Sequence, residues 1–157
     1  NNHNVFIPQF PIEDNQKLEN WFNTIDPLKK YLENSILIGH SLGVPFILNL
    51  LNKFDYKIKS SFLVSGFVGH LEVEDEPNIG DFSEREFEWE KIKSNCGKFY
   101  VIHSDNDPYI PIEKADELAK HLEVHPIIIA DGGHFQGESG YETFDILLDM
   151  IEGKFNK

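Results

Sequence analysis

Short apolar segments that alternate with helical patterns are the feature that most restricts the fold of this chain. These segments are apolar without interruption rather than at every second position, and they cover residues 5–8, 35–38, 61–64, 98–102 and 126–130. A strand that is apolar on both faces must be covered on both faces, which is typical of a parallel sheet between layers of helices. We therefore expect an α/β fold with a doubly wound, mostly parallel sheet.

Helical periodicity fills the intervals between these segments. Apolar residues recur at helical spacing between residues 14 and 32, where Asp26-Pro27 reads as an N-cap with a first-turn proline and predicts two short helices. Further helices are expected at 42–52, 86–94, 112–122 and 141–151. In sheets of this kind, functional residues gather in the loops at the carboxyl ends of the strands.

Composition narrows the classes of function. The 157 residues predict one domain over 1–157, and 27 acidic against 14 basic side chains give a net charge of −13. Such a charge argues against nucleic acid and against an anionic membrane surface as partners. The single cysteine, Cys96, excludes an internal disulfide, and we interpret it as a packing residue. The first residues contain no signal-peptide pattern, so we expect a cytoplasmic protein.

A strand that runs into G-x-S-x-G and then into a helix is the strongest chemical signal in the chain. The motif is Gly39-His40-Ser41-Leu42-Gly43. In a nucleophile elbow, a sharp turn strains the serine backbone and exposes its hydroxyl, and small residues two places away avoid a clash between strand and helix. The backbone N–H of Leu42 is placed to donate to an oxyanion. His40 is adjacent to the serine and points away, so it is not the expected base.

Two later loops supply an acid and a base for Ser41. Asp105, Asp107 and Asp131 compete for the acid role, and we favour Asp107 because Pro108 fixes the backbone that follows it. The other two are interpreted as carboxylates that stabilise turns. His134 is the expected base, since a serine hydroxyl needs a base that a third group orients.

These motifs resemble those of a known superfamily. Gly39-His40-Ser41-Leu42-Gly43, Asp107-Pro108 and Gly133-His134-Phe135 look like the α/β-hydrolase superfamily. Residues 89–96 and 8–11 are similar to one compact branch, the retinoblastoma-binding-protein-nine and YdeN-like serine hydrolases.

The resemblance implies a role for each of three residues: Ser41 as nucleophile, Asp107 as acid and His134 as base. It also implies a small cap or none. Members of the superfamily begin with a strand and a His-Gly loop that completes the oxyanion hole. Nothing of that kind precedes Asn1 in this sequence, so we expect the domain to lack its N-terminal strand and oxyanion loop.

Two other patterns carry less weight. His121 and His125 lie four residues apart, but the intervening glutamate is misplaced for a zinc-protease motif, and we expect a solvated helix end there. Between residues 71 and 90, nine acids surround aromatic residues that include Phe87 and Trp89. This segment is either a solvated surface or an acidic flap over the serine. In the second case Phe87 and Trp89 contact substrate, and neutral or cationic substrates are favoured.

The expected function is a serine hydrolase that cleaves small ester, thioester or amide substrates through an acyl-enzyme, without a cofactor or metal. Its partner is a small-molecule acyl substrate, and a protein partner stays open. Two alternatives remain: a weakly catalytic protein-interaction module on a hydrolase fold, and an acyltransferase that uses the same three residues.

Overall fold

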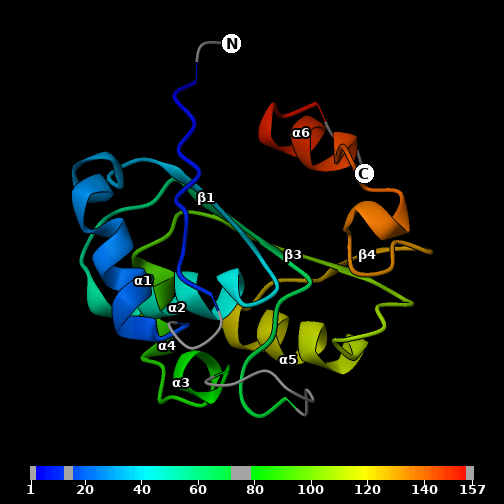
Figure 1. Cartoon of the computed structure of the whole chain (residues 1–157), viewed down its shortest axis with the longest axis horizontal. Coiled ribbons are helices and arrows are strands. Elements are labelled where there is room, and N and C mark those ends of the chain that lie inside the picture. Colours follow the sequence, from blue (N-terminus) through cyan, green and yellow to red (C-terminus); the bar gives the residue numbers. More distant parts are fainter. Residues whose placement is uncertain (1–2, 13–15, 72–78, 155–157) are drawn as a thin grey trace.

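In the part of the chain that the structure describes, a sheet of four parallel strands forms the centre of the molecule (Figure 1). The computed structural model describes residues 3–12, 16–71 and 79–154. The strands are β1 (Ile36–His40), β2 (Ser60–Val64), β3 (Phe99–Ser104) and β4 (Ile127–Ile129), and they lie side by side in that order. Because all pairs are parallel, the carboxyl ends of the four strands meet at one edge of the sheet.

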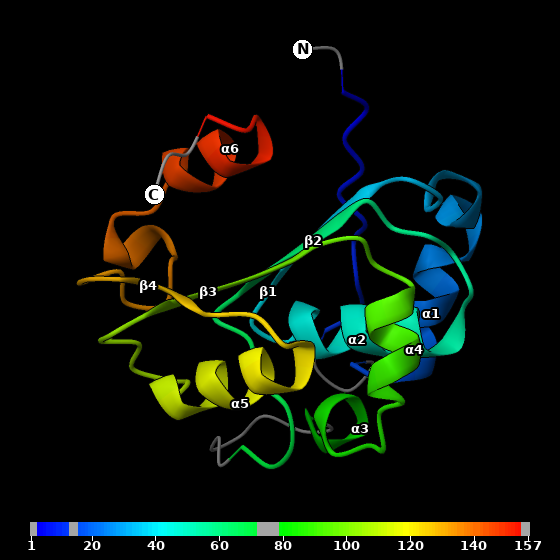
Figure 2. The same ribbon diagram turned by 180° about the vertical axis from the view of Figure 1, so that it is seen from behind.

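Helices cover both faces of this sheet. Figures 1 and 2 show α1 (Leu18–Ile25), α2 (Gly43–Lys53), α4 (Trp89–Ser94) and α5 (Ile112–Leu122) on one face and α6 (Asp145–Ile151) on the other. The remaining short elements are η2 (Asp26–Tyr31), α3 (Ile79–Ser83) and η3 (Gly137–Ser139). The change from α1 to the 3₁₀ helix η2 falls at Asp26, where the sequence predicts a break.

Each face of the sheet has its own apolar core. Along β2, Leu63 points into the core shared with α1, α2, α4 and α5, whereas Phe62 and Val64 point into the core beneath α6. In the second core, Phe62 and Val64 pack with Ile102, Phe135 and Met150. Strands that are apolar on both faces are explained by this double covering.

Residues 5–8 do not form the expected strand. Val5 and Ile7 are 75% and 79% exposed, and the segment is extended coil that runs away from the sheet (Figure 1). Within the described residues it has no strand to pair with, and Phe6 stacks on Tyr31 instead. The last helix is also shorter than predicted and begins at Asp145. None of the helices in the described ranges is both long and apolar enough to span a membrane.

Candidate active site

The sequence motif at residues 39–43 forms a sharp turn between β1 and α2. Ser41 lies in this turn with φ of 53°, a left-handed conformation that strains a residue with a side chain. Its N–H donates to the Val64 carbonyl over 3.0 Å, which ties the turn to the end of β2. Its carbonyl accepts from the Val44 N–H over 3.0 Å and starts the helix. The backbone is that of a nucleophile elbow.

The two glycines of the motif have different roles. A Cβ at Gly39 would lie 2.7 Å from the Gly43 carbonyl oxygen and 2.7 Å from the Ile47 side chain, so the strand can approach the helix only without one. A Cβ at Gly43 would meet no atom within 4 Å. The expected clash is therefore present at Gly39, and the same expectation for Gly43 is wrong.

Leu42, the residue directly before α2, has a backbone donor next to the serine. Among the hydrogen bonds of the described residues, the Leu42 N–H donates to none, whereas the Leu42 carbonyl accepts from Phe46 over 3.2 Å. A backbone N–H at this position, at the positive end of a helix, can stabilise negative charge that develops on a bound carbonyl oxygen.

Asp107 and His134 lie against each other at the same edge of the sheet. His134 Nδ1 donates to Asp107 Oδ2 over 2.8 Å, and their side chains are 8% and 1% exposed. The second carboxylate oxygen, Oδ1, accepts from the backbone N–H groups of Tyr109 at 3.0 Å and Ile110 at 3.1 Å. A bond to Nδ1 leaves the other ring nitrogen, Nε2, as the one able to accept a proton from a nucleophile.

The surroundings of Asp107 keep it ionised. Burial alone would raise the pKa of Asp107, but hydrogen bonds from His134 and from the Tyr109 and Ile110 backbone outweigh burial and lower that pKa to about 2. The buried Ser65 hydroxyl also lowers this pKa from nearby, although its geometry falls short of a hydrogen bond. A carboxylate held in this state can stabilise a positive charge on an adjacent imidazole.

His40 joins the elbow to the histidine loop. Its Nε2 donates to the His134 carbonyl oxygen over 2.7 Å, and the two ring centroids are 4.6 Å apart. Burial lowers the pKa of His40, which favours the neutral ring. Ser41 is thereby held next to the loop that carries His134. No hydrogen bond among the described residues joins the Ser41 hydroxyl to His134, and such bonds are often long before substrate binds.

The other two aspartates that the sequence offers as acids do not contact the imidazole. Asp105 Oδ1 accepts from the Asp131 backbone N–H over 2.8 Å, so the two residues link the loop that carries Asp107 to the loop that carries His134. Of the three candidates, Asp107 is the one hydrogen-bonded to His134.

Phe87 and Trp89 lie far from this cluster. The N–H of Glu88, between them, donates to Asn52 near the carboxyl end of α2, whereas Ser41 precedes the amino end of that helix. A helix of 11 residues is about 16 Å long. Trp89 stacks on His121, with ring centroids 4.2 Å apart. The structure therefore does not bring these aromatic residues to the candidate site, and residues 72–78 of the expected flap lie outside the described residues.

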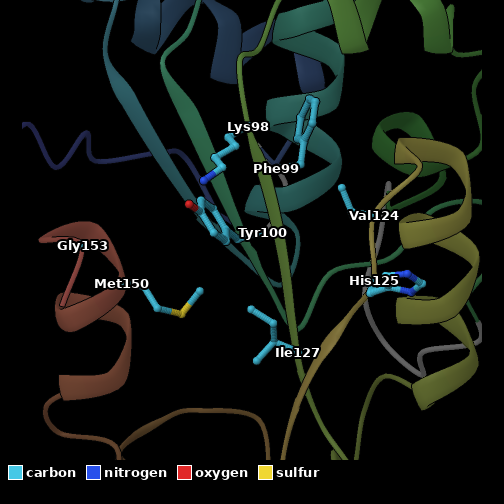
Figure 3. Close-up of a pocket in the computed structure, with 8 residues that line it drawn as sticks. All are labelled: Lys98, Phe99, Tyr100, Val124, His125, Ile127, Met150 and Gly153. Atoms are coloured by element: carbon cyan, nitrogen blue, oxygen red, sulfur yellow. The ribbon is translucent and has the colours of Figure 1, made fainter. Parts of the chain in front are cut away.

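A cavity in the structure lies apart from the candidate site. A cavity of about 540 Å³ opens between α6 and the amino ends of β3 and β4, lined in part by Tyr100, His125 and Met150 (Figure 3). None of Ser41, Asp107 and His134 lines it.

Cys96 is buried, and its thiol contacts Ser61. In the described part of the chain, no cluster of three or more His, Cys, Asp or Glu residues could hold a metal ion.

Sequence reasoning missed several residues that surround Asp107 and His134. The Tyr109 ring packs edge-on against His134 at 5.0 Å, and the fully buried His103 donates from Nε2 to the Ile110 carbonyl over 2.9 Å. Ser104 and Asn106 contact the histidine loop. Their position at the end of a predicted strand is the only signal that could have pointed to them.

Comparisons with known proteins identify relatives by sequence. A family model described as Serine hydrolase matches residues 3–152. The protein YdeN of Bacillus subtilis strain 168 is 29% identical over 144 residues, which cover 90% of this chain and 75% of that protein. Serine hydrolase RBBP9 of Rattus norvegicus is 33% identical over 119 residues, 76% of this chain. This chain spans 62% of RBBP9, which is less than two thirds.

Solved structures agree with these relatives. The crystal structure of the Bacillus subtilis YdeN gene product matches with a TM-score of 0.77 and 28% identity, over 90% of this chain and 76% of that one. A meta-cleavage product hydrolase from Pseudomonas fluorescens IP01 matches with a TM-score of 0.69 over 94% of this chain and 76% of that one. At 12% identity, this second likeness concerns the fold alone. The α/β-hydrolase fold expected from the motifs is confirmed.

Proposed function

Because this chain belongs to the serine hydrolase family, we propose that Ser41, Asp107 and His134 act together to hydrolyse small ester, thioester or amide substrates. The family and the fold confirm the enzyme class expected from the sequence, a serine hydrolase. The proposal adds the acyl substrate, the roles of Ser41, Asp107 and His134, and the route through an acyl-enzyme.

The reaction follows from the chemistry of the three side chains. His134 Nε2 takes the proton of the Ser41 hydroxyl while Oγ attacks the substrate carbonyl carbon. The Leu42 N–H donates to the oxyanion, and Asp107 stabilises the imidazolium through Nδ1–H. The leaving group takes the proton from His134 as the acyl-enzyme forms. Water, deprotonated by His134, then releases the acid and restores Ser41.

The observation that carries the proposal is the 2.8 Å hydrogen bond between His134 Nδ1 and Asp107 Oδ2 next to a strained serine. An ordinary turn serine needs neither a left-handed backbone nor a buried His-Asp pair nearby. The carbonyl of His134 is also hydrogen-bonded to His40, the residue before Ser41.

A fluorophosphonate probe tests the proposal directly, because it labels only a serine whose hydroxyl is activated. We expect the wild-type protein to be labelled and to hydrolyse short-chain p-nitrophenyl esters. Ser41→Ala should lose both activities, and Ser94→Ala, at an exposed serine of α4, should keep both.

Labelling that survives in Ser41→Ala would contradict the assignment of the nucleophile. A wild-type protein that is folded but neither labelled nor active would favour the alternative of a protein-interaction module. Product analysis with competing alcohols or amines separates hydrolysis from acyl transfer, since a transferase would give the new ester or amide rather than the free acid.

A further inference from the structure

The loop that carries His134 has a strained backbone. Asp131, Gly133 and Phe135 have φ of 56°, 55° and 50°, so three of the five residues from 131 to 135 are left-handed. Two of the three have side chains, which disfavour this conformation. Strain of this kind persists only where the surrounding structure holds it in place.

Three consecutive side chains, from the last residue of β3 and the first two of the loop that leads to Asp107, hold this strained backbone. The amide N–H groups of residues 131, 132 and 133 donate in turn to Asp105 Oδ1 at 2.8 Å, Ser104 Oγ at 2.8 Å and Asn106 Oδ1 at 2.7 Å. Ser104 is buried, with 1% of its surface exposed. The three contacts end at the residue directly before His134.

Ser104 and Asn106 are also bonded to each other. The Ser104 hydroxyl donates to Asn106 Oδ1 over 2.7 Å while it accepts from the Gly132 N–H, so that oxygen of Asn106 accepts two hydrogen bonds. Since the Gly133 N–H can only donate, the Asn106 amide oxygen rather than the nitrogen must face it, and the Ser104 hydroxyl donates to the same oxygen. Within the described residues, the Asn106 side-chain nitrogen makes no hydrogen bond, so Asn106 acts through its oxygen.

We propose that Ser104 and Asn106 are positioning residues that fix the 131–135 loop and thereby hold the His134 imidazole against Asp107. This inference rests on the proposed function, since it concerns the geometry of the same site. Asn106 precedes the acid and Gly133 precedes the base, so the hydrogen bond between them sets the spacing of the two catalytic residues. A displacement of about 1 Å in such a site can reduce the rate about 100-fold.

Two substitutions at Asn106 test the proposal. Asn106→Ala removes the shared acceptor and should lower kcat for a short-chain ester about 10- to 100-fold, with little change in KM, because the loop orients the base rather than the substrate. Asn106→Asp keeps an acceptor oxygen at the same place and should retain kcat within about threefold. As a matched control, Asn52→Ala removes another side-chain acceptor of a backbone N–H, at the far end of α2, and should leave kcat unchanged.

A spectroscopic readout makes the test independent of turnover. The Nδ1 proton shared by His134 and Asp107 should give a low-field proton resonance in the wild type, in Asn52→Ala and in Asn106→Asp. It should broaden or vanish in Asn106→Ala at a temperature where circular dichroism shows a folded protein.

An Asn106→Ala variant that keeps both the resonance and kcat would overturn the proposal. The proposal would also be overturned if Asn106→Ala lowered kcat no more than the control Asn52→Ala does. If the wild type is inactive, the proposed function fails, but the resonance still decides whether Asn106 holds His134.

Discussion

The Asp107 carboxylate combines burial with several hydrogen-bond donors, and this combination makes its contribution to stability depend on pH. A carboxyl whose pKa is 3.8 when free and about 2 in the folded protein stabilises the fold above pH 4, and that stabilisation is lost as the pH falls through 2. At 1.36 kcal/mol for each pKa unit, the contribution at pH 7 is about 2 kcal/mol.

Asp107→Asn should therefore lower the free energy of unfolding by about 2 kcal/mol at neutral pH, because the amide cannot carry the charge that the surrounding donors stabilise. The difference from wild type should shrink as the pH falls from 4 to 2, as measured by urea unfolding at each pH. Asp116→Asn, at an exposed position of α5, is the control for loss of a charge. A difference that stays constant between pH 7 and pH 2 would contradict the assigned pKa.

At the scale of single elements, the junction of β1 and α2 depends on the absence of a side chain at Gly39. Gly39→Ala places a Cβ 2.7 Å from backbone and forces the helix away from the strand. Overpacking of this kind costs about 1–3 kcal/mol. We expect a lower melting temperature together with slower fluorophosphonate labelling, because Leu42, whose N–H faces the serine turn, directly precedes the displaced helix.

The matched substitution is Gly43→Ala, which meets open space and starts a helix with a better helix former. Its melting temperature should equal or exceed that of the wild type. If both variants lose stability equally, the contact at Gly39 does not explain why the motif has glycine there. In that case the whole turn would be sensitive to an added side chain at either position.

The sequence predicts an element well when its cause is local, and poorly when the cause lies elsewhere in the chain. The elbow could be predicted because its strand, strained serine and helix occupy neighbouring residues. The helix at Ile112–Leu122 has the bounds that the sequence predicts, because its apolar face repeats at helical spacing. Residues 5–8 have the composition of a strand, but a strand also needs a partner, and composition does not provide one.

The residues of the candidate site also differ in whether a local sequence pattern predicts them. Asp107 could be favoured over Asp105 and Asp131 from the proline that follows it, and the backbone N–H groups after that proline do hold its carboxylate. The contacts of Ser104 and Asn106 with residues 132 and 133 join positions more than 25 apart, and they depend on the register of β3 against β4. No local pattern encodes that register.

At the scale of the whole molecule, a net charge of −13 creates a negative potential that any charged substrate meets. The acidic side chains of residues 81–90 are exposed. However, this segment lies near the carboxyl end of α2, where Phe87 and Trp89 pack, whereas Ser41 precedes the amino end of that helix. Over such a distance their field is screened at physiological salt, where the Debye length is about 8 Å, and persists at low salt, where it is about 30 Å.

The dependence of charge preference on salt distinguishes a general field of the protein from an acidic flap over the serine. For a matched pair of cationic and anionic esters, we expect kcat/KM to favour the cationic ester several-fold at about 10 mM salt and to become nearly equal at about 150 mM. A preference that persists at high salt would place acidic groups within a few ångströms of the bound ester, as the flap hypothesis requires. Equal kcat/KM at both salt concentrations would contradict both explanations, because neither the field nor a flap would then act on the substrate.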